Sequence, residues 1–252
     1  MRHRKPIEGW REPGAISSFS TYLEREEGKP FTKTDFLRNS YGGLEPYVMK
    51  AVIENWKHRG PGKGRPKNFE VALDLGAGAG RHSVDLLRKV ADTVIASDIS
   101  TDAVKSIQAE IARQGLENIR VLRHSMDRIP LQANSCDIIV FWDVLAHGTF
   151  SEVQRTASEL LRVLKPGGIL ILSTLSTSHQ NYGIGEEFEL NTFKGGLPGE
   201  WGKPHHYFTQ SELRTVFKDF TILELREEKR LFGYNEGGLH WCMIARKPIA
   251  SA

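Results

Sequence analysis

Apolar residues along the chain fall into two alternating patterns. Short continuous runs occupy 71–75, 93–98, 119–123, 136–142 and 169–174. Each run has the length of a strand and is too short for a buried helix. Between the runs lie segments whose apolar residues recur three or four positions apart, which predicts amphipathic helices. The alternation predicts a parallel sheet with helices on both faces.

The helical segments carry start and stop signals. The helix after 93–98 begins at Ser100, Thr101 and Asp102, which are capping residues, and ends at Gly115. A helix with its apolar residues between Val153 and Leu164 is stopped by Lys-Pro-Gly-Gly at 165–168. Two more helices are expected, over 81–90 directly before the second strand and over 44–56, where an apolar stripe packs against the sheet.

The last part of the chain has a different order of elements. A short helix over 209–217 is followed by strands at 220–225 and 240–246, with a glycine-rich turn at 233–238 between them. Two consecutive strands joined in this way pair as an antiparallel hairpin. The predicted fold is therefore α/β, a doubly wound and mostly parallel seven-stranded sheet with an antiparallel C-terminal hairpin.

Length and composition limit the classes of protein to which this chain can belong. The 252 residues fit one α/β domain with additions, and a net charge of +3 is too small to indicate a nucleic-acid partner. No apolar run approaches the ~20 residues of a membrane span. The basic start has no apolar stretch after it, which argues against a secretory signal. Cys136 and Cys242 lie in apolar strands, so we expect buried reduced thiols in a cytoplasmic protein.

The sequence divides into an N-terminal cap with a basic linker, 1–67, and a main domain, 68–252. The linker over 57–67 has five Lys or Arg residues and no acid. Such a stretch either contacts phosphates or is a solvated connection, and its Gly and Pro content favours the second. Aromatic residues scattered through 1–33 indicate a segment that docks on the domain across the ligand site; the alternative is a loose tail.

A glycine turn directly follows the first strand. Gly76, Gly78 and Gly80 alternate with alanines, and a helix comes next, which is the first half of a βαβ nucleotide-binding unit. A dinucleotide site needs a third small residue three positions after Gly78, where this chain has Arg81. The spacing therefore disfavours a nicotinamide cofactor.

The pattern G-x-G-x-G, with Asp74 two residues before the first glycine, resembles motif I of the class I S-adenosylmethionine-dependent methyltransferases. Leu-Lys-Pro-Gly-Gly at 164–168 is similar to the turn before that family's fifth strand, and the resemblance runs over 71–247. It implies a Rossmann-like methyltransferase fold with S-adenosyl-L-methionine as cofactor. The stretch 205–213 looks like small soluble methyltransferases near the tellurite-resistance group.

The resemblance and the strand ends together nominate cofactor-binding residues. Asp98 ends the second strand, where a carboxylate accepts hydrogen bonds from ribose hydroxyls; the alternatives are a helix N-cap or a surface acid. The resemblance implies that Asp127 receives the adenine amino group. Asp74 organises the turn or meets the methionine ammonium. The full set is Asp74, Gly76, Ala77, Gly78, Gly80, Asp98, Ile99, Met126, Asp127, Trp142 and Asp143.

Three histidines are candidates for the acceptor side. His147 follows the fourth strand, and His205 and His206 end the long segment 176–208, which has no predicted secondary structure. Loops longer than ~12–15 residues usually have a function, and this one suits a lid over the acceptor. A base is needed only if the acceptor arrives protonated. The alternatives are a histidine helix cap and a plain surface loop. No metal site is predicted, because these His and Glu residues lack a fixed ligand spacing.

The function predicted from these observations is methyl transfer to nitrogen, oxygen or sulfur of a small molecule. An RNA or protein methyltransferase is the alternative enzyme, which the basic linker would serve. Against nucleic acid, the segment after the fourth strand lacks the Asp/Asn-Pro-Pro-aromatic pattern used for amino groups of bases. A catalytically silent partner subunit that binds the cofactor is the alternative from another class. No membrane partner is expected.

Overall fold

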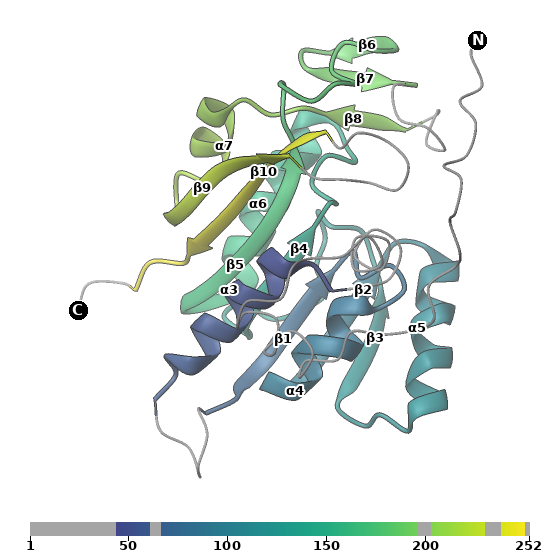
Figure 1. Ribbon diagram of the computed structural model, residues 1–252, viewed down its shortest axis with the longest axis vertical. Helices are drawn as coiled ribbons and strands as arrows, with labels where there is room; N and C mark the ends of the chain where they lie inside the picture. Colours follow the sequence, from purple (N-terminus) through teal and green to yellow (C-terminus); the bar gives the residue numbers. More distant parts are fainter. Residues whose placement is uncertain (1–43, 61–66, 196–202, 230–237, 250–252) are drawn as a thin grey trace, which may run out of the picture.

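A seven-stranded sheet forms the centre of the molecule (Figure 1). The structure is a computed structural model and describes residues 44–60, 67–195, 203–229 and 238–249. The strand order is β3-β2-β1-β4-β5-β10-β9, and β10 runs antiparallel to both of its neighbours. The strands are β1 (Phe69–Leu75), β2 (Ala91–Asp98), β3 (Ile119–Arg123), β4 (Cys136–Trp142), β5 (Leu164–Leu175), β9 (Thr221–Lys229) and β10 (Leu239–Arg246). The predicted fold class is confirmed.

Helices cover both faces of this sheet, as the sequence pattern predicts. One face carries α3 (Pro46–Lys57), α4 (Arg88–Val90) and α5 (Thr101–Gln114), and the other carries α6 (Phe150–Val163) and α7 (Gln210–Val216). Between the two layers, β4 is buried at all seven positions. Its side chains alternate, so that Ile138 and Val140 belong to the first core and Ile139 and Phe141 to the second.

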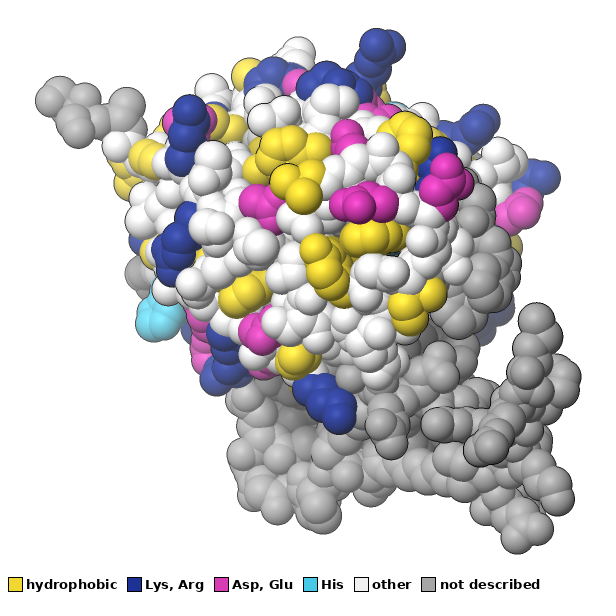
Figure 2. All heavy atoms as spheres, turned by 90° about the horizontal axis from the view of Figure 1, so that it is seen from above, with side chains coloured by type: hydrophobic (Ala, Val, Ile, Leu, Met, Phe, Trp, Pro, Cys, Tyr) yellow, Lys and Arg dark blue, Asp and Glu magenta, His cyan; other side chains and the backbone are white. Residues whose placement is uncertain are grey.

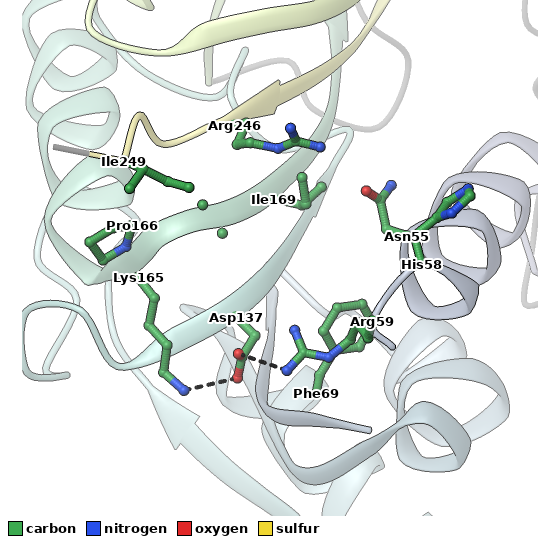
Figure 3. A pocket seen from close by; sticks show the side chains of 12 residues that line it. Asn55, His58, Arg59, Phe69, Asp137, Lys165, Pro166, Ile169, Arg246 and Ile249 are labelled. Atoms are coloured by element: carbon green, nitrogen blue, oxygen red, sulfur yellow. Dashed lines mark hydrogen bonds and ion pairs between the residues drawn. The ribbon is translucent and has the colours of Figure 1, made fainter. Parts of the chain in front are cut away.

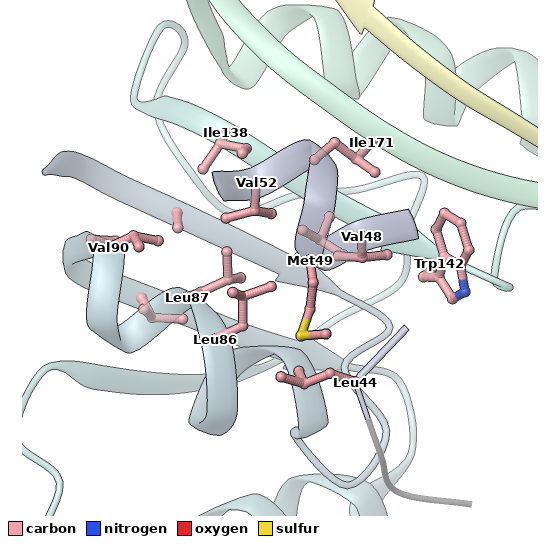
Figure 4. Packing of buried hydrophobic residues seen from close by; sticks show 14 of the residues in the cluster. Leu44, Val48, Met49, Val52, Leu86, Leu87, Val90, Ile138, Trp142 and Ile171 are labelled. Carbon is pink, nitrogen blue, oxygen red and sulfur yellow. The ribbon is translucent and has the colours of Figure 1, made fainter. Parts of the chain in front are cut away.

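The first helix in the described residues belongs to the core of the main domain. Val48, Met49 and Val52 of α3 are buried against the sheet, close to Ile138 and Ile171 (Figure 4). The predicted packing of 44–56 against the sheet is therefore confirmed. The part of the predicted N-terminal cap over 1–43 lies outside the described residues.

The helix ends follow the capping residues. Ser100 accepts a hydrogen bond from the Ala103 amide at the start of α5, and Gly115 closes the helix at φ 62°. The helix predicted over 81–90 is confirmed as one continuous helical segment. It differs in its middle, Ser83–Leu87, which is a π-helical turn before the short α4, and β2 begins at Ala91, two residues earlier than predicted.

The segment 176–208 is not the irregular loop that the sequence predicts. It contains β6 (Glu186–Glu189), β7 (Thr192–Lys194) and β8 (Pro204–His206), which form a small antiparallel sheet. Figure 1 shows this small sheet beyond the carboxyl ends of the parallel strands. Hydrogen bonds from the His206 amide to the Ala146 carbonyl and from the Phe208 amide to the Leu175 carbonyl, both 2.9 Å, join it to the main sheet. The sequence did not predict these strands, because three or four residues are too few to show an alternation of apolar and polar side chains.

The outer face of the small sheet is apolar and acidic. Figure 2 looks down on this end of the molecule and shows hydrophobic side chains interspersed with acidic ones. The exposed large apolar residues of the segment are Tyr182, Ile184, Phe188 and Leu190. Glu186 and Glu187 are exposed beside them.

Both cysteines are buried in strands and form no disulfide, as predicted. Among the residues that the structure describes, no helix is long and apolar enough to span a membrane.

Candidate active site

A pocket of about 480 Å³ opens at the carboxyl ends of the parallel strands. Carboxyl ends of parallel strands meet at one edge, which is where ligands bind in open α/β sheets. The lining residues come from four strand ends and two further positions: Leu75 and Gly76 after β1, Asp98, Ile99 and Ser100 after β2, His124, Ser125, Met126 and Asp127 after β3, Trp142, Asp143, Val144 and His147 after β4, and Glu152 and Lys203.

The pocket brings together most of the predicted site residues. Eight of them line it: Gly76, Asp98, Ile99, Met126, Asp127, Trp142, Asp143 and His147. Six do not line it: Asp74, Ala77, Gly78, Gly80, His205 and His206. The predicted cofactor end is thus assembled around the first three strand ends, and only one of the three predicted catalytic histidines reaches the pocket.

The glycine turn is fixed on one side and open on the other. The amides of Gly76 and Ala77 both donate to the Ser97 carbonyl at 2.8 Å, which joins the turn to β2. A Cβ on Gly76 would lie 2.2 Å from a methyl group of Val144, so only glycine fits against the loop after β4. Gly78 has φ +56°, and a Cβ there would meet nothing within 4 Å. The turn therefore leaves free space in which a ligand can approach the backbone.

Asp98 holds the turn and still has acceptor capacity. Its carboxylate accepts from the Gly78 amide at 2.9 Å and from the Ser100 amide at 2.8 Å. An ionised carboxylate has about four acceptor sites, so two remain for hydroxyl donors. Next to it the Ile99 side chain is 63% exposed, an apolar surface that faces the pocket and suits a flat ring.

Asp127, after the neighbouring strand β3, is an ionised acceptor. Ser125 Oγ donates to it at 2.6 Å and Arg155 Nε at 3.1 Å. The hydrogen bond from Ser125, with a further contribution from Arg155, lowers the pKa of Asp127 below its usual range. The carboxylate is therefore available to an amino group at neutral pH.

Asp74 is enclosed beneath the turn. Its side chain is 2% exposed and accepts a hydrogen bond of 2.5 Å from Ser83 Oγ at the start of the π-helical turn. Burial raises the pKa of Asp74 to about 6, although the Ser83 hydrogen bond and Arg81 oppose the shift. Of the two roles that the sequence leaves open for Asp74, this contact supports the organisation of the turn.

Replacing Asp74 by Asn is expected to stabilise the protein at alkaline pH. The raised pKa means that ionising Asp74 costs more in the folded than in the unfolded state. Stability is therefore greatest when Asp74 is protonated in both states, falls as the pH rises from about 4 to about 6, and levels off above that. At about 1.4 kcal/mol per pKa unit, the gain from Asp74→Asn approaches about 3 kcal/mol above pH 7 and shrinks below pH 5. Urea unfolding at pH 4.5 and 8 measures it, with exposed Asp102→Asn as control. A gain independent of pH would contradict the assignment.

The acceptor end of the pocket holds a pair of histidines from different elements. His147 lines the pocket, and its ring meets that of His205 on β8 edge to face, with 4.8 Å between the ring centroids. The neighbouring His206 lies elsewhere: Nδ1 is 2.7 Å from Thr192 Oγ1, and Nε2 is 3.7 Å from a carboxylate oxygen of Glu212. Burial lowers the pKa of His206. The structure therefore joins His147 to His205 and places His206 in the contact between the small sheet and α7.

Two side chains that the sequence did not nominate surround Asp143. This residue has φ +62°, a backbone conformation that non-glycine residues rarely adopt. Ser173 Oγ accepts from the Asp143 amide at 3.0 Å and donates to its carboxylate at 2.5 Å. His240 Nδ1 on β10 is 3.6 Å from the same carboxylate oxygen. Strained backbone at the edge of a pocket often marks a functional position, here an Asp143 fixed between Ser173 and His240.

The described part of the chain contains no set of side chains that could bind a metal ion. Within residues 44–60, 67–195, 203–229 and 238–249, no three His, Cys, Asp or Glu side chains are grouped so that they hold a metal ion.

Comparison with known proteins agrees with this geometry. Residues 72–168 match the profile of the family described as "Methyltransferase domain". A malonyl-[acyl-carrier protein] O-methyltransferase of Marinomonas sp. is 33% identical over 64% of this chain and 55% of its own length. The tRNA N(3)-cytidine methyltransferase METTL2 of Bos taurus is 29% identical over 58% and 40%. A crystal structure of a SAM-dependent methyltransferase from Methanosarcina mazei has TM-score 0.66 and 23% identity, covering 82% of this chain and 99% of that one.

Residues 72–168 match a methyltransferase domain, and the fold around them is that of the S-adenosylmethionine-dependent methyltransferases. S-adenosylmethionine is therefore the cofactor that these matches indicate. The residues present fit that cofactor, because Gly76 of the turn, the remaining acceptor sites of Asp98 and the exposed Ile99 meet at one end of the pocket. The two curated relatives are about twice as long as the part this chain matches, and their acceptors differ from each other.

Proposed function

We propose that this chain transfers a methyl group from S-adenosylmethionine to a small-molecule acceptor. The observation that carries the proposal is a single pocket with acids and the glycine turn at one end and His147 with Asp143 at the other. Such a pocket holds a nucleoside cofactor beside a second, smaller ligand. Two buried and unbridged cysteines support a reducing, cytoplasmic setting for this reaction.

The residues of the cofactor end have separate roles in the proposal. Asp98 accepts hydrogen bonds from the ribose hydroxyls, Ile99 and Met126 contact the adenine ring, and Asp127 accepts from its amino group. The glycine turn, through its backbone, borders the methionine part. When bound, S-adenosylmethionine supplies a methyl group on an electrophilic sulfonium. Positioning the acceptor atom in line with that group is the largest contribution a protein can make to such a reaction.

On the acceptor side, His147 is the candidate base. It lines the pocket from a loop fixed to β4, and the edge of the His205 ring orients it. His147 removes a proton only from an acceptor that arrives as a hydroxyl or an ammonium. Asp143 borders the pocket beside it, and His240 and Ser173 act as positioning residues through Asp143. The small sheet β6–β8 forms the wall behind His205 and excludes water from the acceptor.

The charge near the pocket favours a small-molecule acceptor over a polyanionic acceptor such as RNA. Glu186 and Glu187 are exposed on the small sheet, and Glu152 lines the pocket itself. Acids at this end repel the phosphates of a nucleic acid, whose binding depends on neutralising those phosphates. An RNA acceptor is the second candidate, because the tRNA methyltransferase of Bos taurus is among the relatives and the linker over 57–67 is basic.

The experiment that tests the function uses methyl-labelled S-adenosylmethionine and a cell extract. The chain is incubated with both, and the label is followed into small-molecule, nuclease-sensitive and protein fractions. Label in the small-molecule fraction is the expected result. Label in RNA or protein would replace the proposed acceptor class, and label in none of them, with cofactor binding intact, would favour the catalytically silent subunit.

Asp98→Ala is expected to weaken binding of S-adenosylhomocysteine by about 10- to 100-fold. The reason is the loss of hydrogen bonds to a charged group, worth about 1.5–3 kcal/mol. Calorimetry without an acceptor measures the affinity, and NADH should give no binding heat. The matched control is Asp102→Ala, an exposed acid on α5 outside the pocket lining. Equal affinities of wild type and Asp98→Ala would remove Asp98 from the cofactor site.

A further inference from the structure

A second pocket, of about 290 Å³, lies at the amino ends of the parallel strands, and Figure 3 shows its lining side chains. It is formed by the amino ends of β1, β4 and β5, together with the carboxyl end of β10 and the end of α3. The length of β4, at about 3.3 Å per residue, separates this pocket from the cofactor pocket by roughly 20 Å. The two pockets share no lining residue.

A buried carboxylate fixes two cations at the base of this pocket. Asp137, whose side chain is 9% exposed, accepts from Arg59 Nη2 at 3.3 Å and from Lys165 Nζ at 3.1 Å. The amides of Glu70 and Val71 also donate to it, each at 2.9 Å. Its acceptor sites are therefore in use. Arg59 and Lys165 are held in place and retain N–H donors that Asp137 does not take.

The lining carries more positive than negative charge. Its cations are Arg59, Lys165 and Arg246, its one acid is Asp137, and Asn55 and His58 add neutral polar groups. The Glu70 carboxylate pairs with Lys165 from outside the lining and is itself exposed. Arg246 is exposed, and Figure 3 shows its side chain extending toward Asn55. Within the described residues, the Arg246 guanidinium has no hydrogen-bond or ion-pair partner that would neutralise its charge.

The other walls are apolar. Phe69 and Ile169 are buried, Pro166 and Ile249 close one side, and the Arg59 guanidinium lies over the Phe69 ring at 4.6 Å from its centroid. Apolar walls around fixed cations focus the electric field and raise the local attraction for an anion. They also leave room for a small apolar group attached to that anion.

We infer that this pocket binds the phosphate group of a ligand. Two guanidinium groups and an ammonium match an anion with several acceptor oxygens, and Arg is the side chain best suited to phosphate. Methyl transfer neither uses nor releases phosphate, so the site goes beyond the proposed function. The phosphate belongs either to a small phosphomonoester or to an RNA backbone, and the two sources are distinguished by experiment.

The test is calorimetry on the full chain saturated with S-adenosylhomocysteine, titrated with inorganic phosphate at constant ionic strength. One saturable site is expected, and Arg246→Gln should weaken phosphate about tenfold or more. The control Arg120→Gln removes the same charge from an exposed position on β3 outside the pocket and should leave the affinity unchanged. Unaltered S-adenosylhomocysteine affinity shows that each variant is folded and keeps this test separate from that of the cofactor site.

A second variant and two further titrations complete the experiment. Lys165→Gln should also weaken the binding of phosphate. With two variants, a folding defect in one of them does not decide the result. Glycerol phosphate and a short single-stranded RNA then identify the source, since the true source binds more tightly than inorganic phosphate and loses affinity in Arg246→Gln. No saturable phosphate binding, wild-type affinity in both pocket variants, or an equal loss in Arg120→Gln would each overturn the proposal.

Discussion

Gly78→Val is expected to abolish binding of S-adenosylhomocysteine, with a loss of at least about 100-fold, or about 3 kcal/mol. The residue has φ +56°, a Cβ on it would enter open space, and it belongs to the same turn as Gly76, which lines the cofactor pocket. A branched side chain would occupy the space through which the ligand reaches the backbone of the turn, and it would resist the positive φ. Calorimetry of the purified variant measures the effect.

The matched control for this change is Gly115→Val. Gly115 has φ +62°, and a Cβ there also meets nothing within 4 Å, but it closes α5 outside the pocket lining. Both substitutions impose the same backbone strain, so the control is expected to lose stability while keeping its affinity. Near-wild-type binding by Gly78→Val would contradict the placement of the cofactor against the turn.

His147→Ala is expected to slow single-turnover methyl transfer by about 100-fold or more, the usual size of a general-base contribution. For a hydroxyl or ammonium acceptor, the wild-type rate should rise with pH around neutrality, where imidazoles commonly titrate. Removing His147 should flatten that rise. The same change at His205 should have a smaller effect, since His205 contacts His147 and does not line the pocket.

His124→Ala is the control within the same pocket. His124 lines the cofactor end after β3, so its removal should change cofactor affinity and leave the dependence of the rate on pH in place. A His147→Ala enzyme with full rate and an unchanged pH profile would end the proposal that His147 is the base. The proton would then be lost by an acceptor that ionises without help from the protein.

Most of the fold could be predicted from the short continuous apolar runs of the sequence. A strand such as β4, covered on both faces, reads as a continuous apolar run, and its bounds of Cys136–Trp142 agree with the sequence prediction. The end of such a strand indicates a site residue, which is how Asp98 and Trp142 were found; Asp127 came from the family resemblance, and all three lie in the pocket.

Sequence reasoning missed Ser173 and His240, which only the topology brings to the nominated Asp143. The three residues belong to elements far apart in the sequence. They meet because β10 inserts antiparallel beside β5, which places His240 opposite Leu175. No local pattern indicates this register, since it depends on which edge of the sheet the last strand joins.

For the adjacent His205 and His206, the secondary structure decides which of the two can take part in the reaction. In an irregular loop, His205 and His206 can both face an acceptor. In the strand β8, neighbouring side chains point to opposite faces, so only one of the pair can reach His147. The contacts of His205 with His147 and of His206 with Thr192 follow this alternation.

The position of β10 also affects how the protein is made. This strand comes last of the seven in the sequence, yet it lies between β5 and β9 and supplies all the hydrogen-bonded pairing of β9 within the sheet. A nascent chain that has synthesised everything up to β9 therefore carries an open edge on β5 and an unpaired β9. Open edges recruit other strands and promote aggregation. Pairing of β10 with β5 and β9 closes that edge against intermolecular pairing.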